Sequence, residues 1–174
     1  TELDNGMTVS VMQDTGDDLD FGNSLITFGN VGGLVDINIG SDGSPMDAID
    51  DITPTAFEEA NGSGSGTYKD VGGLAGEMGI GLKFEVPFLG TVSTQYVPKA
   101  DGTKNADNAA SANTGTKGSG TEIVVVTPLG GLPFVGDVLD GFTLTTGYAE
   151  EEMSQAANTT DRFEYTGALT GSIG

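Results

Sequence analysis

Carboxylates are the residues best equipped for chemistry, and residues 41–51, SDGSPMDAIDD, gather four of them: Asp42, Asp47, Asp50 and Asp51. Hard cations such as Ca²⁺ bind several carboxylate and carbonyl oxygens within one loop. The spacing is not that of an EF-hand, because a ligand at every second position and a closing bidentate Glu are missing. The same residues also fit a short helix with Ser44 as N-cap and Pro45 at its first position. Calcium binding is therefore one hypothesis for this cluster, and a helix cap is the other.

The composition excludes most other site chemistry. The 174 residues contain no His, no Cys and no Trp, so a Ser-His-Asp triad, a thiol nucleophile and an imidazole-bound zinc ion are all impossible. Two carboxylates could serve a glycosidase, but the acids fall mostly in expected loops and no Trp is present to stack a sugar. We predict that the protein is not an enzyme and that it requires no cofactor.

The charge is strongly negative. Asp and Glu number 26 against 6 Lys and Arg, which gives a formal net charge of −20. Such a charge repels nucleic acid and anionic membrane surfaces, and it favours divalent cations. Nucleic acid is therefore excluded as an expected partner.

Most of the chain has the pattern of β-strands. In residues 80–86 apolar side chains alternate with Gly81, Lys83 and Glu85, and residues 162–173 repeat the pattern with Arg162 and Glu164 on the polar side. Alternation of period two gives a strand one apolar and one polar face. Gly, at 29 residues, is frequent inside these runs, which is unfavourable for helices. We expect an all-β, antiparallel fold with about seven strands.

The connections differ in length. Short reversals such as LDNG and PFLG alternate with long polar stretches, one of which is the low-complexity segment 100–120. Outer-membrane barrels have short turns at one end and long loops at the other, with apolar side chains facing outward. A soluble sandwich would instead pack the apolar faces of two sheets together. The pattern favours the barrel, with a short helix in one of its loops.

A series of segments resembles, in order, the Gram-negative outer-membrane general porins: LDNGMTV, TFGNVGG, VPFLGTVSTQYVP, TEIVVVTPL, GFTLTTGYAEEE and FEYTGALTGSIG. The resemblance covers nearly all of residues 1–174, taken as a single barrel segment. Members of that family form barrels of about sixteen strands, so the resemblance implies a partial chain, about half of a barrel.

The resemblance also implies a site. One long loop of these porins folds into the barrel and narrows the pore, and residues 34–75 occupy the corresponding place. The implied constriction acids are Asp42, Asp47, Asp50, Asp51, Glu58 and Glu59. The implied pore-wall residues are Lys83, Glu85, Arg162 and Glu164. Opposed charges across a narrow lumen select ions without covalent chemistry. An arginine cluster and a Pro-Glu-Phe-Gly-Gly motif, which such loops and walls carry elsewhere in the family, are absent here.

The expected function is passive diffusion of small hydrophilic solutes and ions, with cations favoured, through a channel in the cell outer membrane. The resemblance implies a homotrimer, contact with lipid and lipopolysaccharide, and loops that a phage could recognise. The alternative is a soluble, secreted or cell-surface acidic β-rich module associated with calcium, such as an adhesin or structural protein.

Overall fold

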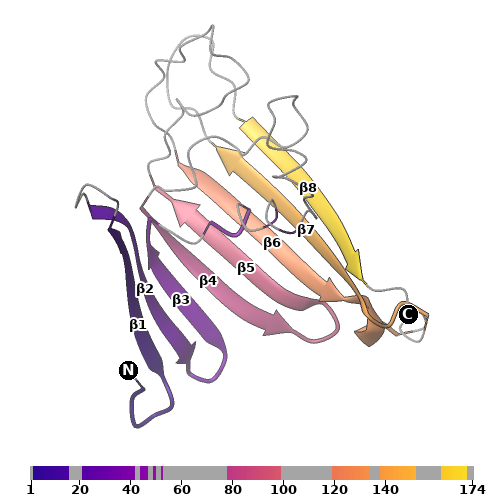
Figure 1. The fold of residues 1–174 in the computed structure, drawn as a ribbon, viewed down its shortest axis with the longest axis horizontal. Coiled ribbons are helices and arrows are strands. Elements are labelled where there is room, and N and C mark those ends of the chain that lie inside the picture. The colour runs from indigo at the N-terminus through magenta and orange to yellow at the C-terminus, as the bar shows by residue number, and fades with distance from the viewer. Residues whose placement is uncertain are drawn as a thin grey trace, which may run out of the picture.

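Eight antiparallel strands form one sheet in the computed structural model. The structure describes residues 2–15, 21–41, 44–46, 49, 52, 78–98, 119–133, 138–151 and 162–171. The strands are β1 (Thr8–Thr15), β2 (Phe21–Val31), β3 (Val35–Gly40), β4 (Gly79–Val86), β5 (Gly90–Val97), β6 (Gly120–Pro128), β7 (Phe142–Glu151) and β8 (Arg162–Gly171). Each strand pairs with the next along the chain, so the sheet is a meander with β1 and β8 at its edges (Figure 1).

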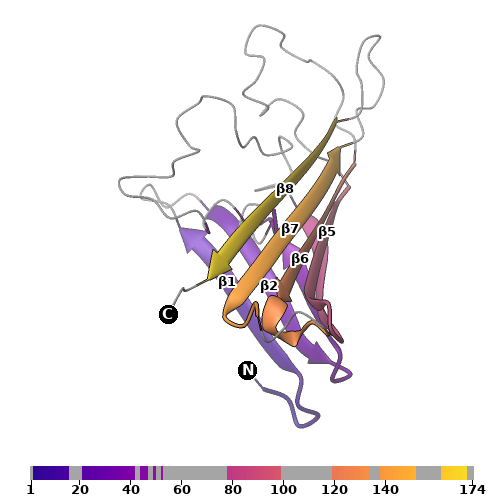
Figure 2. The ribbon, with the colours of Figure 1, turned by 90° about the vertical axis from the view of Figure 1, so that its right-hand side faces the viewer.

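The sheet is open and curved. Figure 2 shows it bent into a trough, with the middle strands β5 and β6 on one side and both edge strands on the other. The all-β antiparallel expectation is confirmed, whereas these residues alone do not close into a barrel.

Two expectations about the elements were wrong. The sheet has eight strands rather than seven, because residues 35–40, which we assigned to the start of the constricting loop, form β3. The connection between β3 and β4 therefore begins at Ser41. Similarly, Gly120, expected at the end of the 100–120 loop, begins β6; most of that loop lies outside the described residues.

Turn chemistry explains the short connections. Gly32 and Gly33 join β2 to β3 with φ angles of 63° and 75°, which glycine adopts without steric cost. Between β4 and β5, the Leu89 amide donates to the Val86 carbonyl at 3.1 Å across Pro87 and Phe88. The connection between β6 and β7, at the same end of the sheet, is longer and includes the 3₁₀ turn η2 (Leu129–Gly131).

The two faces of the sheet differ sharply in polarity. Residues directly opposite each other in an antiparallel pair share a face, so the strand registers sort the side chains. The apolar face includes Val11, Ile26, Ile37, Leu82, Val92, Tyr96, Ile123, Leu144, Phe163, Tyr165 and Leu169. The polar face includes Ser10, Thr27, Asp36, Asn38, Lys83, Glu85, Ser93, Gln95, Glu122, Thr145, Glu164 and Thr166.

Large side chains of the apolar face are exposed on every strand, although Val92 on β5 is buried. Leu82 is 41% exposed, Phe163 61% and Tyr165 70%, whereas core side chains of these types are normally buried. Aromatic side chains on this face lie close to one another: the ring centroids of Tyr148 on β7 and Tyr165 on β8 are 6.1 Å apart, and those of Phe163 and Tyr165, both on β8, are 5.7 Å apart.

The buried core lies on the opposite, polar face. Met46 and Ile49, from the segment after β3, pack on Val97, Val124 and Ala149. The described pieces of this segment cross in front of β5 and β6 in Figure 1, on the hollow side of the trough. The main hydrophobic contact in the described structure therefore joins the connection between β3 and β4 to the centre of the sheet.

Candidate functional site

The candidate site is the polar face together with the described part of the segment after β3: Ser44, Pro45, Met46, Ile49 and Ile52. We call these five residues the crossing segment. The amide of Ile49 donates to the carbonyl of Met46 at 3.0 Å, and that of Ile52 to the carbonyl of Ile49 at 3.2 Å. Ile49 is helical where we expected a short helix, and most of that helix lies outside the described residues.

Glu122 fixes the crossing segment to β6. The Ser44 hydroxyl lies 3.0 Å from Oε1 and 2.8 Å from Oε2 of the Glu122 carboxylate, and the Met46 amide donates to Oε2 at 3.2 Å. Glu122 is 0% exposed and Ser44 is 7% exposed. The buried Glu122 carboxylate therefore lies under the crossing segment and accepts hydrogen bonds from Ser44 and Met46.

Sequence reasoning did not identify Glu122. The only local signal is a single acid in TEIVVVTP, directly before an unbroken apolar run. Its partners are 76 and 78 residues away along the chain, which no local pattern can reveal.

Gly147 gives the crossing segment its close approach to β7. A Cβ atom added to Gly147 would collide with Met46 Sδ and would lie 2.7 Å from Ile49 Cδ1. Real Cβ atoms do not come so close to other heavy atoms. A larger residue at position 147 would therefore require the ends of the Met46 and Ile49 side chains to move.

Gln95 lies beside Glu122, as its partner across β5 and β6. Gln95 is 5% exposed, and its Oε1 atom has no hydrogen-bond partner among the described residues. A buried amide oxygen without a partner costs stability, so the contacts of the crossing segment have to offset that cost.

The pore-wall residues expected from the sequence lie on the polar face. Lys83 and Glu85 are exposed on β4, where Lys83 is the register partner of Asp36 and Ser93. Glu85 accepts a hydrogen bond from Thr91 Oγ1 at 2.5 Å.

Glu164 lies on the same face of β8, and Arg162 is the register partner of Glu151 at the start of that strand; the side chain of Arg162 is outside the described part. Four strand spacings separate β4 from β8, about 19 Å along the sheet, so the structure does not bring Lys83 and Arg162 together.

All six expected constriction acids, and with them the four expected calcium ligands, lie outside the described residues: Asp42, Asp47, Asp50, Asp51, Glu58 and Glu59. Met46 and Ile49, which are next to some of these acids in the sequence, pack against the polar face of the sheet. The described residues contain no group of three or more acidic, His or Cys side chains that could hold a metal ion. Within the same residues, no helix is long and apolar enough to cross a membrane.

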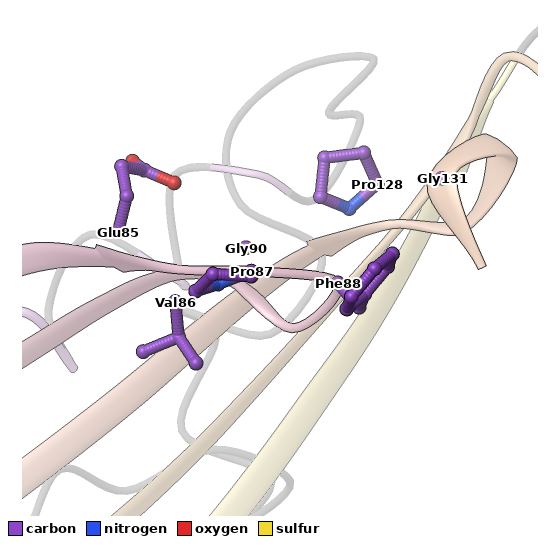
Figure 3. A pocket seen from close by; sticks show the side chains of 7 residues that line it. All are labelled: Glu85, Val86, Pro87, Phe88, Gly90, Pro128 and Gly131. Carbon is purple, nitrogen blue, oxygen red and sulfur yellow. The ribbon is translucent and has the colours of Figure 1, made fainter.

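A hollow of about 400 Å³ lies beside the turn between β4 and β5. Its lining is drawn in Figure 3, where Glu85 and Val86 project to opposite sides of the strand. Among the described residues of this lining, Glu85 is the only one with an ionisable side chain.

Comparisons of the chain with models of protein families, with curated proteins and with solved structures found no match.

Proposed function

We propose that this chain is a segment of an outer-membrane porin, a β-barrel through which small hydrophilic solutes and ions diffuse passively. One observation carries the proposal: the sheet has an apolar face that stays exposed from β1 to β8, while its opposite face is polar and is crossed by a fixed chain segment. In a bilayer the apolar face meets acyl chains and the polar face lines water.

The open edges fit the same proposal. Backbone groups at a sheet edge need partners inside a membrane, and spanning sheets therefore close into barrels. Further strands beside β1 and β8 would complete the ring, as the resemblance to porins of about sixteen strands implies. The sheet is curved in Figure 2, which supports closure into a ring.

The crossing segment is the proposed constriction. The acids next to it in the sequence, Asp42, Asp47, Asp50 and Asp51, would face the lumen opposite Lys83, and with a formal net charge of −20 the channel would favour cations. The same proposal includes assembly as a homotrimer, contact with lipopolysaccharide through bound divalent ions, and recognition of the long loops by phage.

The test is conductance, in planar bilayers under a salt gradient, of the complete barrel that contains this chain. The proposal predicts stable channels whose reversal potential shows cation preference. Insertion without conductance would reject the channel, and an anion-selective reversal potential would reject the charge argument. Fractionation separates the proposal from a soluble secreted module: a porin stays with the outer membrane and shows heat-modifiable migration on gels, whereas a secreted module remains in the supernatant of a detergent-free spin.

A further inference from the structure

Glu122 is a buried carboxylate on the polar face of the sheet. Lys83 and Glu85, on the same face, are exposed, whereas Glu122 is 0% exposed. Its register partners Gln95 and Ala149 are buried as well. Ser44 and Met46 of the crossing segment lie against Glu122, and Met46 and Ile49 pack with Ala149, so the crossing segment covers the face at Glu122 and Ala149.

The contacts of Glu122 are directional. Ser44 and Met46 both donate to one carboxylate, and hydrogen bonds to a charged acceptor are stronger and more demanding of geometry than neutral ones. The apolar contacts of Met46 and Ile49 with Val97, Val124 and Ala149 add burial but are non-directional. The carboxylate is therefore the group that sets where the crossing segment sits.

We propose that Glu122 is the positioning residue of the constriction: it holds the crossing segment over β5, β6 and β7 and so sets the largest solute that passes. The part of this inference that concerns solute size rests on the proposed function. The part that concerns the position of the segment does not.

The position is tested by thiol labelling. The chain has no Cys, so Ile49→Cys, at a site that is 4% exposed, gives a single reporter under the segment. Labelling of the folded protein with a maleimide is compared in the parent, in Glu122→Gln and in Glu85→Gln, a matched control on the same face. Loss of hydrogen bonds to a charged group should raise the labelling rate about tenfold in Glu122→Gln, and Glu85→Gln should leave it unchanged.

Ser44→Ala keeps the test decisive if Glu122→Gln does not fold. It removes the hydroxyl donor from the segment and leaves the carboxylate in place, so it should also accelerate labelling. Unchanged labelling in Ser44→Ala and in every folded Glu122 variant would overturn the inference.

The consequence for permeation is measured on the same variants, without the reporter, as single-channel conductance and as the largest polyethylene glycol that enters the pore. Both should increase in Glu122→Gln, while Glu2→Gln, a control at an exposed acid outside the proposed pore wall, should keep the size limit of the parent. Conducting channels with an unchanged size limit would overturn the role in permeation. Faster labelling in a protein that never conducts would reject the proposed function while leaving the positioning role intact.

Discussion

Gly147 and Met46 are in contact across the hollow side of the sheet, with no space for a methyl group between them. Gly147 lies in the middle of β7, where glycine weakens a strand because it leaves nothing to pack and loses more entropy on folding. Here the missing side chain makes room for Met46 and Ile49. The glycine is thus explained by the close approach of the crossing segment.

Gly147→Ala should disturb the packing of the Met46 and Ile49 side chains on β7. Inserting a methyl group into a packed contact costs about 1–3 kcal/mol, so the temperature at which the folded form unfolds on heat-modifiability gels should fall. The matched control is Gly167→Ala on the neighbouring strand β8, where the nearest atom to an added Cβ is 3.5 Å away. Equal losses in the two variants would contradict the close contact at Gly147.

Phe88→Asn should stabilise the turn between β4 and β5. Phe88 has a φ of 66°, a left-handed conformation that costs a bulky residue about 1–3 kcal/mol and that Asn tolerates better. Phe88 is 75% exposed, so little packing is lost. We expect a gain of about 1 kcal/mol in the free energy of unfolding by urea titration.

Leu89→Asn is the control for that substitution, because Leu89 is also exposed but does not have a positive φ. It should bring no gain. Destabilisation by Phe88→Asn would show that contacts of the Phe88 ring outweigh the backbone strain.

Lys83→Glu should increase cation preference. Lys83 is one of only 6 cationic residues in the chain, and it is exposed on the polar face opposite Asp36. Reversing its charge makes the potential of the proposed lumen more negative. The reversal potential under a salt gradient should move toward that of an ideal cation channel, with Lys83→Gln between the two. A reversal potential that does not respond to either variant would place Lys83 outside the conducting path.

Calcium binding by Asp42, Asp47, Asp50 and Asp51 stays a prediction. If several of these carboxylates share one ion, calorimetric titration of the chelator-treated protein with Ca²⁺ should give a saturable heat that is lost when all four are changed to Asn. The control changes four acids elsewhere: Glu85, Asp101, Asp107 and Asp140. Equal heats from the two variants would contradict a specific site and would show that Ca²⁺ is attracted non-specifically by a highly acidic protein.

Local pattern was sufficient to predict most strands and their faces. Alternation in residues 80–86 correctly separates Leu82 from Lys83, because the period of a strand is a property of neighbouring residues. The same alternation exists in β3, where Val35, Ile37 and Ile39 share a face. The sequence analysis missed β3 because this strand is short and lies between a Gly-Gly turn and an acidic segment.

Long-range contacts could not be predicted. Glu122 and Ser44 lie 78 residues apart, and whether a polar strand residue meets water or a returning segment depends on the whole chain. The backbone strain at Phe88 was likewise invisible, since Pro-Phe-Leu-Gly suggests a turn without stating which residue takes the positive φ. The sequence predicted the correct face for the charged residues of the proposed pore wall. It could not predict the distance between Lys83 and Arg162, because that distance depends on how many strands lie between β4 and β8.

The central claim is that the apolar face meets lipid and the polar face meets water. The chain contains no Trp. Leu82→Trp and Lys83→Trp are adjacent on β4 but on opposite faces, so the fluorescence of each variant reports on one face in vesicles of brominated phosphatidylcholine. The account predicts blue-shifted emission and strong bromine quenching for Leu82→Trp, and red-shifted, unquenched emission that aqueous iodide quenches for Lys83→Trp. Equal bromine quenching at the two positions, or none at position 82 in the membrane-bound protein, would contradict it.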